Sequence, residues 1–299
     1  MKSQFDFGTI IGLVAGIICI FVTMIWPEVD RSEMILTTDG GWRFEQLSWF
    51  YQPQAVFIVL GGVISATLVN YPIKAVINMG NVFKNVILSE KFDFASTIDK
   101  IVVLAEKARK DGLLSLESDL NDIDSVFLRN GVELAINERD TNRLRTFLTM
   151  DLNNISTRHV SAQEIILYMA AYAPAFGMLG TVLGLIIMMN KFQMSGETSS
   201  VDFNVADQFQ SLLVGMGTAL ITTFYGVFLA NMVFLPLGGK LKRRSENEIM
   251  LKNIVLEGII SIHGREHPVL IKEKLMTFVA MSERKTLEIA RGVTDKHLP

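Results

Sequence analysis

The stretches IILYMAAYAPAFGMLGTVLGLIIMM (165–189) and FQSLLVGMGTALITTFYGVFLANMVFLPL (209–237) decide the fold of this chain. Each is longer than the about 20 apolar residues that a helix needs to cross a bilayer. Neither contains Asp, Glu, Lys or Arg. Proline and threonine at membrane depth are tolerated where protein or water surrounds them, because lipid offers no hydrogen-bond partner. A polar pathway is therefore predicted along two prolines and three threonines: Pro174, Thr181, Thr222, Thr223 and Pro236.

Two further stretches are apolar enough to span a membrane: FGTIIGLVAGIICIFVTMIW (7–26) and VFIVLGGVISATLVNY (56–71). The first is too long for a signal peptide and ends in Trp26-Pro27 rather than a small-residue cleavage site, so we expect it to be retained. Overall, 49% of residues are hydrophobic, 20% are charged and the mean hydropathy is +0.34. The prediction is an all-α integral membrane protein with four transmembrane helices and a helical cytoplasmic domain.

Basic residues give the orientation. Twelve Lys and Arg residues lie between positions 74 and 158, and more follow position 240, whereas the intervening loops hold few. Because cytoplasmic loops carry the excess of Lys and Arg, both termini are predicted to be cytoplasmic. Four parts are predicted along the chain. Residues 1–71 hold transmembrane helices 1 and 2 with an outer loop at 27–53, and residues 72–162 form a cytoplasmic helical domain. Residues 163–237 hold transmembrane helices 3 and 4 with a short outer loop at 191–207, and residues 238–299 form cytoplasmic C-terminal helices.

The block after residue 92 has apolar residues at helical spacing, as in Ile98, Ile101, Val102 and Ala105, which predicts a bundle of amphipathic helices. Gly112 follows Arg109-Lys110-Asp111 and is a predicted helix end, since glycine accepts the left-handed conformation and cations suit the C-terminal end of a helix. Gly131 is predicted to end a helix for the same reason, and Pro268 to break one.

Small residues recur at helical spacing in the third and fourth apolar stretches. Such spacing lets helix backbones approach closely in lipid, so these positions are predicted to pack helices, either within the chain or between copies of it. Threonines on the same faces could also serve only in packing, because a threonine hydroxyl often donates to a carbonyl of the preceding helical turn. The glycines expected to pack are Gly177, Gly180, Gly184 and Gly226.

The absence of a carboxylate from the apolar stretches limits the functions that this chain can perform without a partner. Ion transport generally needs an ionisable group inside the membrane, so a partner must supply one if this chain moves ions. The single Cys19 and the four histidines lack ligand spacing, and the sequence has no nucleotide-binding or nucleophile motif. We therefore expect neither an enzyme nor a cofactor, and no nucleic-acid partner.

Four runs together resemble the MotA/PomA family of flagellar motor stator subunits, part of the MotA/TolQ/ExbB superfamily. They are GGVISATLVNYP (61–72), ARKDGLLSLE (108–117), YAPAFGMLGTVLGLI (172–186) and TTFYGVFLANMVFLPLGGKLKRR (222–244). The resemblance covers nearly the whole chain in order. It implies a location in the bacterial inner membrane, in contact with membrane lipid. It also implies a homo-pentamer around two single-span MotB/PomB-type partners, each supplying an essential aspartate.

The resemblance also implies roles for single residues. Pro174 and Pro236 match two prolines linked to ion-coupled conformational change. Arg109 and Glu117 match a charged pair that engages the rotor protein FliG, and Lys110 matches a neighbouring basic residue; ordinary solvation is the alternative for all three.

The transported ion is expected to be Na+ rather than H+. Sodium needs several oxygen ligands, whereas a proton needs only the partner's carboxylate. Thr181, Thr222 and Thr223 match threonines at the ion site of sodium-type subunits, so these three residues are the expected Na+ ligands.

The outer loop at 27–53 is longer than in many members of the family.

Two other functions compete with the stator. A TolQ/ExbB-type energy transducer typically has three spans, which the four expected here disfavour. A self-contained secondary transporter would show internal repeats and a central charged site, and the sequence has neither.

Overall fold

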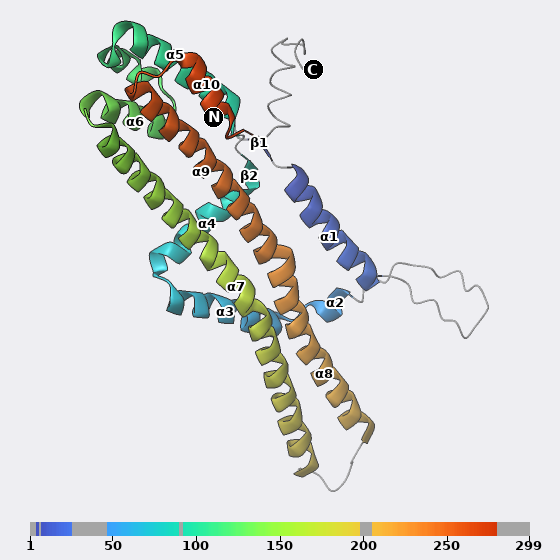
Figure 1. Cartoon of the computed structure of the whole chain (residues 1–299). Helices are drawn as coiled ribbons and strands as arrows, with labels where there is room; N and C mark the ends of the chain where they lie inside the picture. The colour runs from blue at the N-terminus through green and yellow to red at the C-terminus, as the bar shows by residue number, and fades with distance from the viewer. Residues whose placement is uncertain (1–3, 6, 26–46, 90–91, 198–204, 280–299) are drawn as a thin grey trace, which may run out of the picture. The chain divides into compact units, whose positions relative to one another are not determined.

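The structure is a computed structural model that describes residues 4–5, 7–25, 47–89, 92–197 and 205–279. Helices make up nearly all of it, which confirms the all-α prediction (Figure 1). The α-helices are α1 (Phe7–Ile25), α2 (Leu47–Phe50), α3 (Pro53–Asn70), α4 (Ile73–Ile87), α5 (Phe94–Asp111), α6 (Val126–Asn137), α7 (Thr141–Glu197), α8 (Val205–Phe228), α9 (Leu235–His263) and α10 (Pro268–Met276). A 3₁₀-helix η2 (Leu113–Asp122), a π-helix η3 (Leu229–Phe234) and an antiparallel pair of strands, β1 (Gln4–Phe5) and β2 (Leu88–Ser89), complete the described elements.

The chain forms two compact units. Unit 1 comprises residues 1–89 and 161–241, and unit 2 comprises residues 90–160 and 242–299. The long helices α7 and α9 contribute residues to both units. Helix α4 groups with unit 1, so unit 2 begins at residue 90, within the stretch 72–162 predicted to be a cytoplasmic helical domain.

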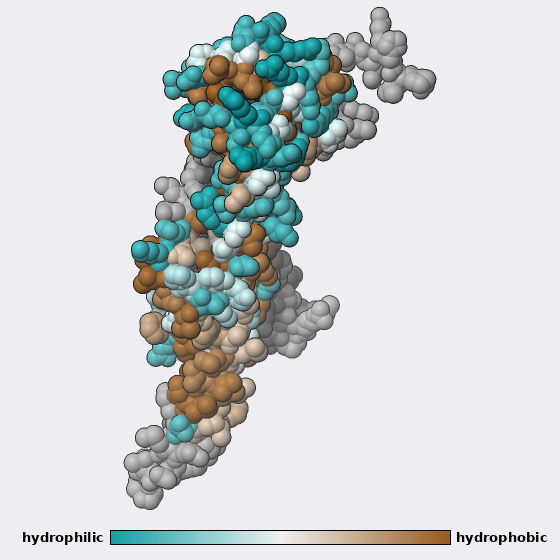
Figure 2. All heavy atoms as spheres, turned by 60° about the vertical axis from the view of Figure 1, so that its left-hand side comes forward, coloured by the Kyte–Doolittle hydropathy of each residue, from teal (hydrophilic) through white to brown (hydrophobic). Residues whose placement is uncertain are grey.

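Three helical stretches in the described part are long and apolar enough to cross a membrane: 53–70, 141–190 and 212–263. The first apolar stretch forms α1 (Phe7–Ile25), whose part Ile11–Ile25 is apolar but shorter than these three. Figure 2 shows hydrophobic residues over wide areas of unit 1, whereas hydrophilic residues predominate on unit 2. Most of the expected outer loop 27–53, through position 46, and the centre of the loop 191–207 lie outside the described residues.

Helices α7 and α8 run antiparallel with their backbones in contact (Figure 1). A Cβ atom added at Gly226 would lie 2.5 Å from the Ala173 carbonyl oxygen and 3.1 Å from the Gly177 Cα. Further along, Gly180 faces the side chain of Thr222, and Gly184 faces Ala219. Because lipid gives apolar helices no hydrophobic reason to associate, contacts between small residues carry the association.

The α7–α8 pair is covered on one side by α2 and α3. Phe176 of α7 packs over Gly62 of α3, and α3 also contacts α8. The Tyr225 hydroxyl of α8 donates a hydrogen bond to the Phe50 carbonyl oxygen of α2. A cluster that includes the buried Val63 joins α3, α4, α7 and η3. The other side of the pair has no such cover among the described residues.

The π-helix η3 precedes Pro236. The Leu235 N–H donates to the Ala230 carbonyl, five residues back, instead of the usual four. Pro236 has no N–H, and a proline ring clashes with the carbonyl four residues earlier, which here is that of Met232. A wider turn relieves that clash, so we attribute the π-helix to the proline. The Met232 side chain then extends against Gly16 of α1.

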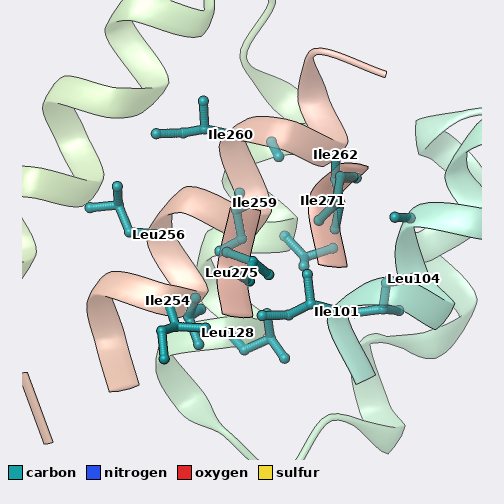
Figure 3. Packing of buried hydrophobic residues seen from close by; sticks show 14 of the residues in the cluster. Ile101, Leu104, Leu128, Ile254, Leu256, Ile259, Ile260, Ile262, Ile271 and Leu275 are labelled. Carbon is teal, nitrogen blue, oxygen red and sulfur yellow. The ribbon is translucent and has the colours of Figure 1, made fainter. Parts of the chain in front are cut away.

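Unit 2 has a core of aliphatic side chains from α5, α6, α7, α9 and α10, several of them shown in Figure 3. Asp93 caps α5 by accepting a hydrogen bond from the Ser96 N–H, and α5 ends at Gly112, where φ is 85°, as predicted. The helix end predicted at Gly131 is wrong. Gly131 lies inside α6, where its missing side chain makes room for Ile259, and α6 begins at the Ser125 cap.

An ion-pair network holds three helices of unit 2 together. Arg145 of α7 donates two hydrogen bonds to Glu257 of α9, with N···O distances of 2.6 and 3.2 Å. Lys274 of α10 lies 3.4 Å from the same carboxylate. The hydrogen bonds from Arg145 lower the pKa of Glu257, and the same bonds raise the pKa of Arg145.

We expect Gly226→Ala to lower the free energy of unfolding of the purified protein by about 1–3 kcal/mol, because the new methyl group meets backbone atoms that cannot rotate away. Gly217→Ala, in the same helix, is the control: a Cβ there meets nothing within 4 Å. The measurement is the midpoint of unfolding in mixed detergent and SDS micelles. Equal midpoints for the two variants would contradict the close packing of α7 on α8.

We expect Arg145→Met to destabilise unit 2 at pH 7 by about 1 kcal/mol, because a bidentate pair is lost at a partly exposed site. The folded-state pKa of Glu257 is lowered, so its stabilisation is complete above the unfolded pKa, about 4.3, and is lost as the pH falls through the folded pKa. The difference between variant and wild type should therefore shrink below pH 4. Hydrogen exchange of the α9 amides, corrected for intrinsic rates, measures it.

The control for this experiment is Lys100→Met, which removes an exposed pair with Asp124. We expect little change there at any pH. A gap between Arg145→Met and wild type that stays constant from pH 7 to pH 3 would show that the variant acts through packing rather than through the Glu257 charge.

Candidate functional site

The uncovered edge of the α7–α8 pair carries the predicted pathway residues. Successive residues of an α-helix turn by about 100°. On α7, Phe176 faces α3 and Gly177 faces α8, so Thr181 is turned by about a further 40° beyond Gly177, away from Phe176. On α8, Tyr225 faces α2 and Thr222 faces α7, which places Thr223 on the opposite edge from Tyr225. Thr181 and Thr223 therefore share the edge that α2 and α3 leave open.

The two threonines lie at nearly the same level along the pair, since Gly177 contacts the Thr223 Cα and Gly180 contacts Thr222. The Thr181 hydroxyl donates to the Met178 carbonyl at 2.5 Å, which leaves its oxygen able to accept. The Thr223 hydroxyl has no hydrogen-bond partner within the part of the chain that the structure describes. Both side chains are half-buried.

Thr222 has a different environment. It is 2% exposed, and its hydroxyl lies 2.7 Å from the Ala219 carbonyl and 3.1 Å from the Gly177 carbonyl of the facing helix. The second contact joins α8 to α7 by a side-chain hydrogen bond, which is favourable where lipid offers no alternative partner. Thr222 therefore belongs to the helix contact, next to the open edge.

The two prolines lie at opposite ends of this region. Pro174 lies inside α7, half-buried, with its Cα 3.2 Å from the Cβ position of Gly226. Pro236 is exposed in the first turn of α9, directly after η3. Neither proline donates a backbone hydrogen bond, so the carbonyls of Ala170 and Met232 lack their usual helical partner.

Hydroxyl and carbonyl oxygens are the ligands that hard cations prefer. The open edge offers the oxygens of Thr181 and Thr223, with apolar neighbours such as Met178, Val182 and Leu220 exposed around them. No carboxylate lies in the apolar stretch 165–189 of α7, nor in the stretch 209–237, which runs from α8 through η3 to the start of α9. The edge can therefore supply part of a coordination shell but no negative charge.

A second candidate surface lies in unit 2. Arg109 and Lys110 are exposed in the last turn of α5, and Glu117 is exposed on η2. None of these three side chains has an ion-pair partner among the described residues. Charged side chains that remain unpaired at fixed positions are available to a partner of complementary charge.

Two features fix η2 against α5. Gly112 joins them with φ at 85°, a conformation that L side chains rarely adopt. Lys107 of α5 then donates to Asp119 of η2 at 2.6 Å and to the Ser118 hydroxyl at 3.1 Å. The hydrogen bond from Lys107 lowers the pKa of the Asp119 carboxyl. The relative placement of Arg109, Lys110 and Glu117 depends on these contacts.

Sequence reasoning missed several of these features. It assigned Thr222 and Thr223 the same role as ion ligands, because only the contact with α7 shows that the Thr222 hydroxyl is buried and bonded to the Gly177 carbonyl. It also missed η3, although Pro236 after an unbroken apolar run was the available signal. The Lys107–Asp119 pair follows no pattern at its spacing of twelve residues.

Known proteins are similar to this chain in sequence and in fold. The profile of the MotA/TolQ/ExbB proton channel family matches residues 119–253. Motility protein A of Borreliella burgdorferi is 32% identical over 246 residues, which cover 82% of this chain and 89% of that protein. Chemotaxis protein PomA of Vibrio alginolyticus is 26% identical over 284 residues, which cover 95% of this chain and 99% of that protein.

The structure of the flagellar MotAB stator complex from Bacillus subtilis contains a chain that matches with a TM-score of 0.75 at 25% identity, covering 93% of this chain and 98% of that one. The similarity thus extends through both units, from the apolar helices to the aliphatic core of unit 2. The chain belongs to the MotA/PomA family of flagellar motor stator subunits, within the MotA/TolQ/ExbB proton channel family.

Proposed function

We propose that this chain is the ion-conducting, torque-generating subunit of a flagellar stator, and that it couples inward sodium flow to rotation of the rotor. In this proposal the open edge of α7 and α8 faces a MotB/PomB-type helix that brings the essential aspartate. The partner aspartate supplies the charge, and Thr181 and Thr223 supply neutral oxygens beside it. Thr222 keeps the two helices together.

The observation that carries the proposal is the polar edge without a carboxylate. Lipid would be a poor neighbour for Thr223, whose hydroxyl lacks a partner in the described chain, so a polar or ionic neighbour fits this edge better. The solved structure that contains the matching chain is a MotAB stator complex, which supports a MotB-type partner for this chain. A homo-pentamer around a partner dimer, as the family resemblance implies, would place five such edges around the partner helices.

We favour sodium over protons as the transported ion because of the number of oxygen ligands at this edge. A proton needs one carboxylate, whereas sodium binds through several oxygen atoms. The edge adds the two hydroxyl oxygens of Thr181 and Thr223 to those of the partner's carboxylate, which a proton would not need. Pro174 and Pro236 would let α7 and α9 change shape when the ion binds.

Two observations support a cytoplasmic location for both termini. The strand β1 pairs with β2, so residues 4–5 lie beside residues 88–89, at the start of the chain segment that leads into unit 2. That unit carries most of the basic residues, which the inner side of a bacterial membrane favours. Arg109, Lys110 and Glu117 would then be available to the rotor protein FliG in the cytoplasm.

The function is tested by co-expression with a MotB-type partner in a flagellated bacterium from which the stator genes have been deleted. We expect swimming only when both chains are present, and none when the essential aspartate of the partner is changed to asparagine. Rescue of a strain lacking TolQ, without any gain of swimming, would instead favour an energy transducer.

The ion is tested with two neighbouring threonines. We expect Thr223→Ala to raise the sodium concentration for half-maximal swimming speed by roughly tenfold, which corresponds to about 1.4 kcal/mol of ion binding. Thr222→Ala is the control: it removes the hydrogen bond to Gly177 and should lower the speed by a similar factor at every sodium concentration. Potassium keeps the ionic strength constant. Unchanged swimming after complete replacement of sodium would exclude sodium coupling.

A further inference from the structure

The outer face of η2 carries an exposed leucine in line with Glu117. A 3₁₀-helix has three residues per turn, so side chains three apart lie directly above one another. Leu113 and Leu116 therefore share the inner face, and Leu116 is 1% exposed in the core. Leu114 and Glu117 share the outer face, where Leu114 is 73% exposed.

The position of Leu114 is fixed rather than adaptable. Gly112, at φ 85°, sets the direction in which η2 leaves α5, and the Ser115 hydroxyl donates back to the Gly112 carbonyl at 2.7 Å. Lys107 holds the far end of η2 through Ser118 and Asp119. The ordering of this segment is therefore complete before any partner arrives, which lowers the entropy lost on binding.

The charges around Leu114 indicate the kind of partner. Arg109 and Lys110 precede it at the end of α5, and Glu117 follows it one turn later, all without ion-pair partners in the described chain. An apolar side chain inside a polar border is the usual arrangement of a binding anchor, because the border keeps water from the buried contact. A single exposed leucine would need no explanation by itself, but one fixed between unpaired charges of both signs does.

We propose that Leu114 is the apolar anchor of the rotor-binding surface. It fills an apolar pocket on the rotor protein, between an acidic group that meets Arg109 and Lys110 and a basic group that meets Glu117. The inference rests on the proposed stator function and adds the contact that the charged residues alone do not provide. Because apolar burial is not screened by salt, this contact retains affinity at ionic strengths that weaken exposed charge pairs.

The test uses the full chain with its MotB-type partner in the swimming host. We expect Leu114→Ala to shorten the residence of stators at the rotor by about tenfold, as loss of an interface anchor does. Leu114→Met keeps an apolar side chain of similar size and should restore it. Leu270→Ala is the matched control, because Leu270 is a leucine of unit 2 that is 63% exposed on α10. Residence is measured by fluorescence recovery of labelled stators in motors at stall.

A second measurement does not depend on a loss of function. A photo-reactive benzoylphenylalanine in place of Leu114 should form a cross-link to FliG, whereas the same group in place of Leu270 should not. Cross-linking from position 114 to another copy of this chain would overturn the proposal, as would normal residence of Leu114→Ala.

Arg109→Glu distinguishes the anchor role of Leu114 from the rotor-binding role of the whole surface. Short residence of Arg109→Glu with normal residence of Leu114→Ala would reject the anchor alone. Normal residence of both would reject the rotor-binding role of this surface and the anchor with it.

Discussion

The close approach of α7 and α8 is the constraint on which the rest of the apolar unit depends. Glycine at position 226 brings one helix backbone against the Ala173 carbonyl of the other, and Gly180 leaves room for Thr222. Once the helices meet on this face, the helical repeat determines every other direction around them. Phe176 and Tyr225 turn toward α3 and α2, whereas Thr181 and Thr223 turn toward the open edge. The candidate ion site is thus a geometric result of glycine packing.

The π-helix shows how a local defect can serve packing at a distance in the sequence. Pro236 removes one hydrogen bond of the helix, and the preceding turn widens so that Leu235 donates to Ala230. The widened turn presents Met232 to Gly16, which gives α1 a contact with the remainder of unit 1. A change in the backbone near Pro236 would therefore alter the packing of α1 against η3 as well as the helix that contains the proline.

Helix length, hydropathy and local signals could be read from the sequence, because each depends on neighbouring residues. The end of α5 at Gly112 is an example, since cations and a glycine stand side by side in the chain. Gly131 carries a similar local signal but lies within α6, because packing against Ile259 decides its role. The pairing of Arg145 with Glu257 spans 112 residues, and the burial of Thr222 depends on Gly177 of another helix. Such features follow from tertiary contacts that sequence periodicity does not specify.

The separation between Thr222 and its neighbour Thr223 has an evolutionary consequence. The hydroxyl of Thr222 is engaged in joining two helices, so replacement there disturbs the fold. Thr181 and Thr223 lie at the edge of the contact, where a change to alanine or serine removes no bond between the helices. If the proposed ion site is correct, selection can retune the ion preference by single substitutions at this edge, without first acquiring compensating changes in the helix pair.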